Sequence, residues 1–176
     1  MQDIIIKNED FGLENKDFSE NHDTRYASRG IVVNPETKEI AVVVKVNINE
    51  YKLPGGGKEG DETEEETFYR EVFEETGCKV NIIKKLGVIK EERSGIDQIQ
   101  YSNIFVSELI EDTGELHPTE KEIEEGLTIK WMNVDDALNA IKNSFNTVTG
   151  DERGIYVEHF IIQRDVKILE AYKNSL

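Results

Sequence analysis

The sequence contains very little sulfur or histidine. Cys78 is the only cysteine among 176 residues, which excludes an intrachain disulfide bond and a zinc site built from cysteines. The three histidines, His22, His117 and His159, are widely scattered and show no metal-ligand spacing. The fold must therefore be held by a hydrophobic core, which a chain of this length can form without cross-links.

Long hydrophobic runs are also missing. Apolar stretches such as Ile31–Val33 and Ala41–Val44 are as long as strands, whereas a membrane-spanning helix needs about 20 apolar residues. The N-terminus shows no basic stretch followed by an apolar run, so no signal peptide is visible. We therefore expect a cytoplasmic protein without a membrane partner.

Positive charge is scarce. The chain has 21 lysines and arginines against 37 aspartates and glutamates, which gives a formal net charge of −16. A field of this sign repels phosphate backbones and argues against polymeric DNA or RNA as a partner. Most of these carboxylates are expected to serve only solubility. Carboxylates crowded on one face differ, because a bound metal would supply the counter-charge that they need.

Hydrophobic periodicity and turn residues predict one domain, an α/β fold with helices packed on a mixed sheet. Residues 1–24 are mostly polar and are expected to form an N-terminal extension, with an edge strand at Ile4–Ile6, before a domain of residues 25–176. Strands are expected at Arg25–Val33, Glu39–Val46, Val80–Ile89, Gln98–Val106 and Leu127–Met132. Helices are expected at Glu62–Glu75, Val134–Ser144 and Ile155–Tyr172, and an acidic loop at Glu108–Glu125.

The first expected helix follows a glycine run. Gly55–Gly57 is expected to break regular structure and to let the backbone approach a ligand closely. Asp61 is predicted to cap the helix, with Glu64 three residues later completing a capping box. Gly77 is a natural residue to end it. The segment is therefore read as strand, loop, helix and loop.

This helix carries the residues that indicate chemistry. At about 100° per residue, Glu71, Glu74 and Glu75 fall within roughly a third of its circumference. We expect them to project together from its exposed side, while an apolar face packs on the sheet. That apolar face comprises Phe68, Tyr69, Val72 and Phe73. Glu71 and Glu75 are four residues apart, a spacing at which like charges repel and destabilise a helix. A bound Mg²⁺ would remove this repulsion, because Mg²⁺ prefers carboxylate oxygens and shares them with substrate phosphates.

The spacing of these residues separates a site from a merely solvated acidic helix. Gly56 is followed by five residues, Glu62, seven residues and then Arg70-Glu71-Val72-Phe73-Glu74-Glu75-Thr76-Gly77-Cys78. This pattern resembles the Nudix box, the signature of the Nudix hydrolase family. Every charged and glycine position matches. Cys78 stands where the family usually has Ile, Leu or Val, and a buried cysteine behaves as a small hydrophobe.

The resemblance implies an α/β/α sandwich around a mixed sheet. It implies a pyrophosphohydrolase that uses water to cleave the diphosphate bond of a nucleoside diphosphate linked to another group. Mg²⁺, or alternatively Mn²⁺, would be the cofactor, bound by Glu71, Glu74 and Glu75 as catalytic residues. Nucleoside triphosphates, ADP-ribose-like compounds and nucleotide sugars are the substrates considered. The markers of ADP-ribose, dinucleoside polyphosphate, NADH and coenzyme A hydrolases are missing downstream of the box.

Other residues take supporting roles by the same resemblance. Arg70 would orient Glu74 or a neighbouring carboxylate, and Glu62 would support the loop–helix–loop. The Gly56 region would offer a backbone carbonyl to a metal, and Gly77 completes the box. A general base could come from the box helix or from a later loop, whose candidates are Glu120, Glu122, Glu124 and Glu125.

Substrate contacts and two alternative functions remain open. Candidate phosphate contacts are Arg25, Arg29, Lys45, Lys52, Lys58 and Arg93, and candidate stacking residues are Tyr26, Tyr51 and Phe105. A catalytically silent module that binds nucleotides or regulates is one alternative, and loss of a box glutamate would mark it. Isomerisation of an isoprenoid diphosphate is another, but Cys78 is in the wrong place for it. The protein is expected to be a monomer or a homodimer.

Overall fold

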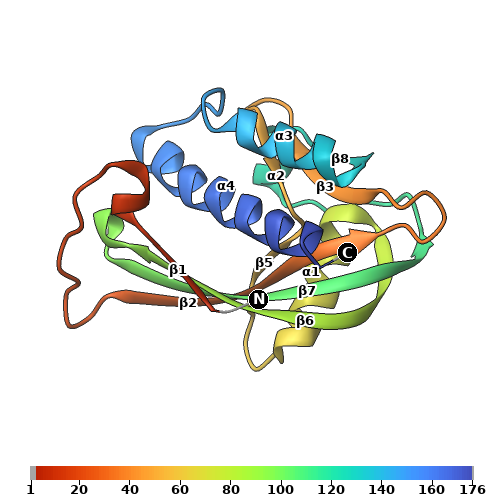
Figure 1. Ribbon diagram of the computed structural model, residues 1–176, viewed down its shortest axis with the longest axis horizontal. Helices are drawn as coiled ribbons and strands as arrows, with labels where there is room; N and C mark the ends of the chain where they lie inside the picture. The colour runs from red at the N-terminus through yellow and green to blue at the C-terminus, as the bar shows by residue number, and fades with distance from the viewer. Residues whose placement is uncertain (1–2, 176) are drawn as a thin grey trace.

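A mixed eight-stranded sheet forms the centre of the computed structural model, which describes residues 3–175 (Figure 1). The main path of the sheet is β1-β6-β7-β2-β3-β4, with β5 paired to β2 and β8 paired to β3. The strands are β1 (Ile4–Lys7), β2 (Asp23–Val33), β3 (Ile40–Lys45), β4 (Glu50–Lys52), β5 (Gly55–Gly57), β6 (Cys78–Arg93), β7 (Gln98–Asp112) and β8 (Leu127–Met132). The edge strand expected near Ile4 is present as β1, parallel to β6.

Helices cover both faces of this sheet. Figure 1 shows α3 (Val134–Ser144) and α4 (Glu152–Lys173) on one side and α1 (Glu64–Thr76) on the other. Short helical turns complete the chain: η1 (Asn8–Phe11), η2 (Ser94–Ile96) and α2 (Glu120–Glu124). The arrangement is the expected α/β/α sandwich in a single domain.

Two hydrophobic clusters hold the layers together. Alternate residues of a strand point to opposite faces, so Ile31 of β2 packs into the cluster beneath α4, and Val32 packs into the cluster beneath α1. Phe68 and Val72 of α1 are fully buried in the second cluster. Cys78 is also buried there, in the packing position that its place in the box predicts.

The glycine run does not break regular structure, contrary to expectation. It forms β5, which pairs antiparallel with residues 27–29 of β2. A Cβ atom on Gly55 would lie 2.3 Å from Cβ of Arg29, so the two backbones approach more closely than any side chain would allow. The start of the box is therefore fixed to the central sheet.

The first turn of α1 also differs from expectation. Thr63, not Asp61, is the N-cap: its side chain accepts a hydrogen bond from Glu66 N, and the Glu66 side chain accepts one from Thr63 N. Glu62 thereby stays outside the helix. The expected acidic loop is shorter than predicted, because β7 continues to Asp112 opposite β6, and α2 follows.

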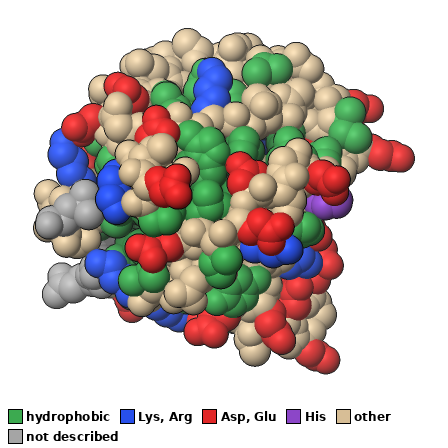
Figure 2. Space-filling model, turned by 90° about the vertical axis from the view of Figure 1, so that its right-hand side faces the viewer, with side chains coloured by type: hydrophobic (Ala, Val, Ile, Leu, Met, Phe, Trp, Pro, Cys, Tyr) green, Lys and Arg blue, Asp and Glu red, His purple; other side chains and the backbone are tan. Residues whose placement is uncertain are grey.

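Acidic side chains are spread over the face shown in Figure 2, around a band of hydrophobic side chains. On this face the negative charge is therefore distributed and not confined to one patch. Between residues 3 and 175, no helix is long and apolar enough to cross a membrane.

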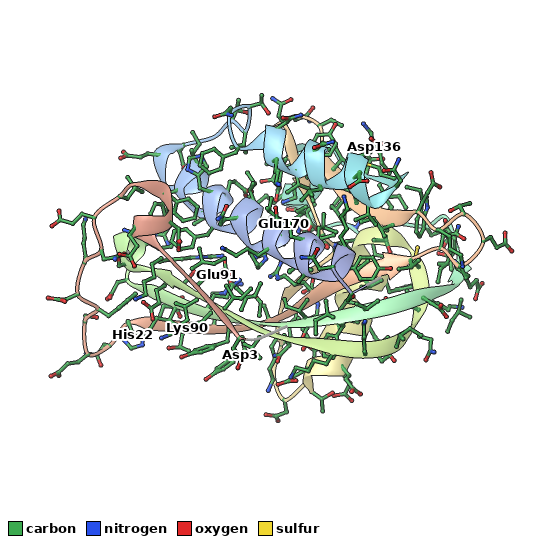
Figure 3. All side chains as sticks on the ribbon, viewed as in Figure 1. Asp3, His22, Lys90, Glu91, Asp136 and Glu170 are labelled. Carbon is green, nitrogen blue, oxygen red and sulfur yellow. The ribbon has the colours of Figure 1, made fainter. Side chains whose placement is uncertain are left out.

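A network of charged groups lies in the core between the sheet and α4. Glu91 sits beneath α4 (Figure 3) and is fully buried, with Arg93 Nη2 2.8 Å and Arg164 Nη1 3.5 Å from its carboxylate oxygens. Arg164 Nε lies 2.8 Å from Asp165 Oδ1, and Asp165 Oδ2 accepts a hydrogen bond from Leu53 N. The network therefore ties α4 to β6 and to the segment that leads into the box.

Because of this network, the free energy of unfolding should depend on pH. Burial alone would raise the pKa of Glu91, but the charges of Arg93, Arg164 and Arg29 outweigh it and lower that pKa to about 2. A lowered carboxyl pKa stabilises the fold above the unfolded value near 4.5, and this contribution is lost as pH falls toward 2. Glu91→Gln should destabilise the protein at pH 7, and its deficit relative to wild type should shrink by about 3 kcal/mol between pH 7 and pH 2.

Urea unfolding of both proteins across this pH range measures the deficit. A deficit that stays constant with pH would show that Glu91 does not titrate as the network requires.

Candidate active site

The carboxylates of the box lie at the interface of α1 with β4 and β5, and not on the exposed side of the helix as expected. Side-chain exposure is 4% for Glu75 and 14% for Glu71, while Glu74 remains 42% exposed. The reason lies in the glycine strand: a Cβ atom on Gly56 would lie 2.3 Å from Glu71 Oε2, so only glycine leaves room for that carboxylate.

Glu75 is held from two directions. Lys52 Nζ of β4 lies 2.5 Å from Glu75 Oε1, and Gly55 N donates a 2.8 Å hydrogen bond to Oε2. Both contacts come from the segment immediately before the box. The sequence interpretation considered Lys52 only as one of six candidate phosphate contacts and missed this pairing, which joins residues 23 positions apart.

Arg70 links most of the box. Its Nε and Nη2 donate to the carboxylate of Glu62 at 2.6 and 3.0 Å, and Nη2 also donates to Gly57 O at 2.8 Å. Its Nη1 reaches Glu71 Oε1 at 2.9 Å and Glu74 Oε2 at 3.1 Å. Only the planar fork of a guanidinium presents donors in enough directions to hold all four partners.

The electrostatics of this interface suit a cation. Burial, reinforced by the negative charge of Glu75, raises the pKa of Glu71. Four carboxylates, those of Glu62, Glu71, Glu74 and Glu75, meet the two positive charges of Arg70 and Lys52, which leaves an excess of two negative charges. A divalent cation would balance that excess, and carboxylate oxygens are the ligands that Mg²⁺ prefers.

The box carboxylates are at present directed to protein donors. Among the described residues, no three acidic, histidine or cysteine side chains form a group that could hold a metal ion as they stand. Glu71 is turned to Arg70, and Glu75 is turned to Lys52 and Gly55. The donor set fits a divalent cation in charge and chemistry, and metal binding would require these side chains to change partners.

The four candidate bases of the later segment lie in different surroundings. Glu120 and Glu124 are exposed, and Glu122 completes the capping box of α2 with Thr119. Glu125 alone is turned inward, with its Oε2 2.8 Å from Lys45 Nζ. Its role, like that of the other three, stays a prediction.

The candidate substrate contacts also fall into two groups, those buried or paired inside the protein and those exposed to solvent. Arg29, Lys52 and Arg93 are buried in internal contacts, and Lys45 pairs with Glu50 and Glu125, whereas Arg25 and Lys58 are exposed. Phe105 belongs to the core, and the ammonium of Lys130 lies over the Tyr51 ring. Tyr26 is 55% exposed and stacks on Tyr101, with ring centroids 5.6 Å apart. Tyr26 is therefore the candidate most accessible for stacking.

A mixed sheet between helices, with a carboxylate-bearing helix fixed to it by a glycine strand, defines an α/β/α domain with an acidic site. The family model of the NUDIX domain matches residues 24–149. The chain therefore belongs to the Nudix family.

Relatives and solved structures agree with this assignment. Nudix hydrolase 6 of Arabidopsis thaliana is 32% identical over 61% of this chain and 38% of its own length. Human diphosphoinositol polyphosphate phosphohydrolase 3-alpha is 30% identical over 51% of each chain. The chain thus spans about half or less of the length of these curated relatives. A NUDIX hydrolase from Nitrosomonas europaea has the same fold, with a TM-score of 0.61, 14% identity and coverage of 86% of this chain and 90% of its own.

Proposed function

We propose that this protein is a divalent-metal-dependent pyrophosphohydrolase that cleaves the diphosphate bond of a nucleotide-like molecule. The observation that carries the proposal is the pair Glu71 and Glu75, two carboxylates packed against a glycine strand with excess negative charge around them. Arg70 and Lys52 offset only part of this charge, and buried carboxylates are costly unless their charge is compensated. The names of the relatives, which include diphosphoinositol polyphosphate phosphohydrolases, support chemistry on diphosphate bonds.

In this mechanism Glu71, Glu74 and Glu75 would hold Mg²⁺ or Mn²⁺. A divalent metal, when bound, supplies Lewis-acid polarisation of a phosphoryl oxygen and lowers the pKa of a coordinated water. Arg70 fixes the positions of Glu62, Glu71 and Glu74 through its fork of donors. Precise positioning and charge neutralisation provide most of the catalysis in phosphoryl transfer.

A general base would activate the attacking water. A box glutamate, or Glu125 from the segment after α2, would accept the proton from the attacking water. The attack would be in line on one phosphorus, with the other phosphoryl group leaving. The Gly56 region, whose backbone packs directly against the Glu71 carboxylate, would offer a peptide carbonyl to the metal.

The alternative is a Nudix-fold module that binds nucleotides without turnover. The presence of Glu71, Glu74 and Glu75, each at its place in the box, favours the enzyme. A substrate panel decides between them: nucleoside triphosphates including oxidised ones, ADP-ribose, dinucleoside polyphosphates, NADH, nucleotide sugars and a diphosphoinositol polyphosphate. Hydrolysis of one compound with Mg²⁺, abolished by excess chelator, supports the enzyme and identifies the substrate. Failure to hydrolyse any of them, together with tight nucleotide binding, would favour the module.

The packing of Gly56 gives a further prediction. Gly56→Ala places a methyl group against the Glu71 carboxylate and should displace it by about 1 Å, which is expected to lower kcat about 100-fold. The fold should persist, because the clash involves the end of a side chain. Gly154→Ala is the matched control: Gly154 lies in the first turn of α4 without a left-handed backbone, a Cβ atom there would meet only Asp151 at 3.1 Å, and the variant should change kcat little. If the two variants have equal kcat, the position of the Glu71 carboxylate does not matter for catalysis and Glu71 is not a site residue.

A further inference from the structure

Lys52 occupies a position that affects how the site takes up a cation. Its ammonium is 2.5 Å from Glu75 Oε1, and only 10% of its side chain is exposed. A divalent cation bound to Glu75 would be repelled by this neighbouring charge, and screening by water is weak at a buried position. The Lys52–Glu75 pair therefore competes with metal binding.

A second acceptor for Lys52 lies on the same strand. Glu50 is two residues earlier on β4, so both side chains point to the same face of the sheet. Glu50 is 1% exposed, and neither of its carboxylate oxygens accepts a hydrogen bond within residues 3–175. Lys45 Nζ is 3.2 Å from Glu50 Oε2 but supplies only a charge contact.

Lys45 supplies a charge contact to Glu50 but no hydrogen bond, and a buried carboxylate is costly unless it is both paired and hydrogen-bonded. Glu158 of α4 lies close to Glu50. Burial together with the charge of Glu50 raises the pKa of Glu158 to about 8, so at pH 7 Glu158 is mostly protonated and Glu50 carries the negative charge of the pair. Glu50 is thus a buried anion on the same face of β4 as Lys52.

We propose that Lys52 is a mobile counter-ion. It neutralises Glu75 until a divalent cation binds there, and its side chain then rotates so that the ammonium pairs with Glu50 instead. The inference rests on the proposed function, because it takes Glu75 as a metal ligand. The transfer needs only rotations within the flexible four-carbon stem of the lysine. Glu50 is then a positioning residue that sets metal affinity without touching the metal.

Mn²⁺ binding to the full chain tests the proposal without any substrate, with free Mn²⁺ measured by electron paramagnetic resonance. Lys52→Met removes the competing ammonium and should lower the Kd for Mn²⁺ about tenfold, the equivalent of one charge-assisted hydrogen bond. Glu50→Gln removes the negative charge that would hold the displaced ammonium and should raise that Kd about tenfold.

A double-mutant cycle separates transfer from a simple effect of charge. If Glu50 affects metal binding only by pairing with the displaced Lys52, adding Glu50→Gln to the Lys52→Met variant should change the Kd for Mn²⁺ by less than about twofold. A direct effect of the Glu50 charge on the metal would persist in that background. Lys45→Met is the matched control, because Lys45 belongs to the same cluster but pairs with Glu50 and Glu125, and it should shift the Kd less than Lys52→Met.

Circular dichroism checks that each variant is folded. If Lys52→Met is unfolded, Lys52→Gln also removes the ammonium, and its Kd for Mn²⁺ is measured instead. Weaker Mn²⁺ binding by the Lys52 variant, or an undiminished effect of Glu50→Gln without Lys52, overturns the proposal and leaves the proposed function standing. Failure of the wild-type protein to bind Mn²⁺ overturns both.

Discussion

Glu75→Gln is expected to lower kcat for the diphosphate substrate by roughly 10³-fold or more, since a lost metal ligand removes several kcal/mol of transition-state stabilisation. The substitution keeps the shape of the side chain and removes its charge. Glu75 is 3% exposed and touches Lys52 and Gly55, so a side chain of equal size preserves the packing of α1 on β5. Steady-state turnover, with circular dichroism to confirm the fold, measures the effect.

Glu65→Gln is the matched control for this experiment. Glu65 lies in the first turn of the same helix and is exposed, so the variant makes an identical chemical change away from the interface. Its kcat should equal that of wild type. Near-normal turnover by Glu75→Gln would exclude Glu75 as a metal ligand.

Arg164→Met is expected to destabilise the fold by about 3–5 kcal/mol, because it removes one partner of a buried charge network and leaves the others uncompensated. Arg164 is completely buried, and it contacts both Glu91 of β6 and the neighbouring Asp165. The Tm should fall by roughly 10 °C for a chain of this size. Urea and thermal unfolding measure the two quantities.

The control for this change is Lys142→Met. Lys142 pairs with Glu170 of α4 at 2.8 Å, but both side chains are nearly half exposed. An exposed pair contributes less than about 1 kcal/mol. If Arg164→Met costs no more than Lys142→Met, the buried network does not stabilise the packing of α4 on the sheet.

Local periodicity was enough to predict that Glu71, Glu74 and Glu75 share one side of α1, although it placed that side in solvent. Three glutamates at positions 71, 74 and 75 share one face of any α-helix, and alternating apolar residues predicted most of the strands. The burial of Glu71 and Glu75 was not predictable, because it depends on β5. A run of glycines has no side-chain pattern, and its pairing with residues 27–29 of β2 is a long-range contact.

The helix start illustrates a different limit. The sequence offers two capping boxes, Asp61 with Glu64 and Thr63 with Glu66, and local propensity does not separate them. The structure uses the second, which leaves Glu62 free to accept two hydrogen bonds from Arg70. The start of α1 thus coincides with an ion pair that local propensity alone does not indicate.

Pairings of buried charges were the least predictable part of the site. Glu75 meets a lysine 23 residues earlier in the chain, and Glu91 meets an arginine 73 residues later. Charged residues are normally exposed, so the sequence interpretation considered Lys52 only as a phosphate contact or a surface charge and did not single out Arg164. Only the packing of α1 and α4 on opposite faces of the sheet brings the pairs together.

The most direct test of the proposed function is turnover of the best panel compound in ¹⁸O-labelled water, first with Mg²⁺ and then with excess chelator. The account predicts that Mg²⁺ supports cleavage, that the label enters a phosphate-containing product, and that chelator stops the reaction. Turnover that survives the chelator, or label found only in a product without phosphate, would contradict a metal-dependent attack of water on phosphorus.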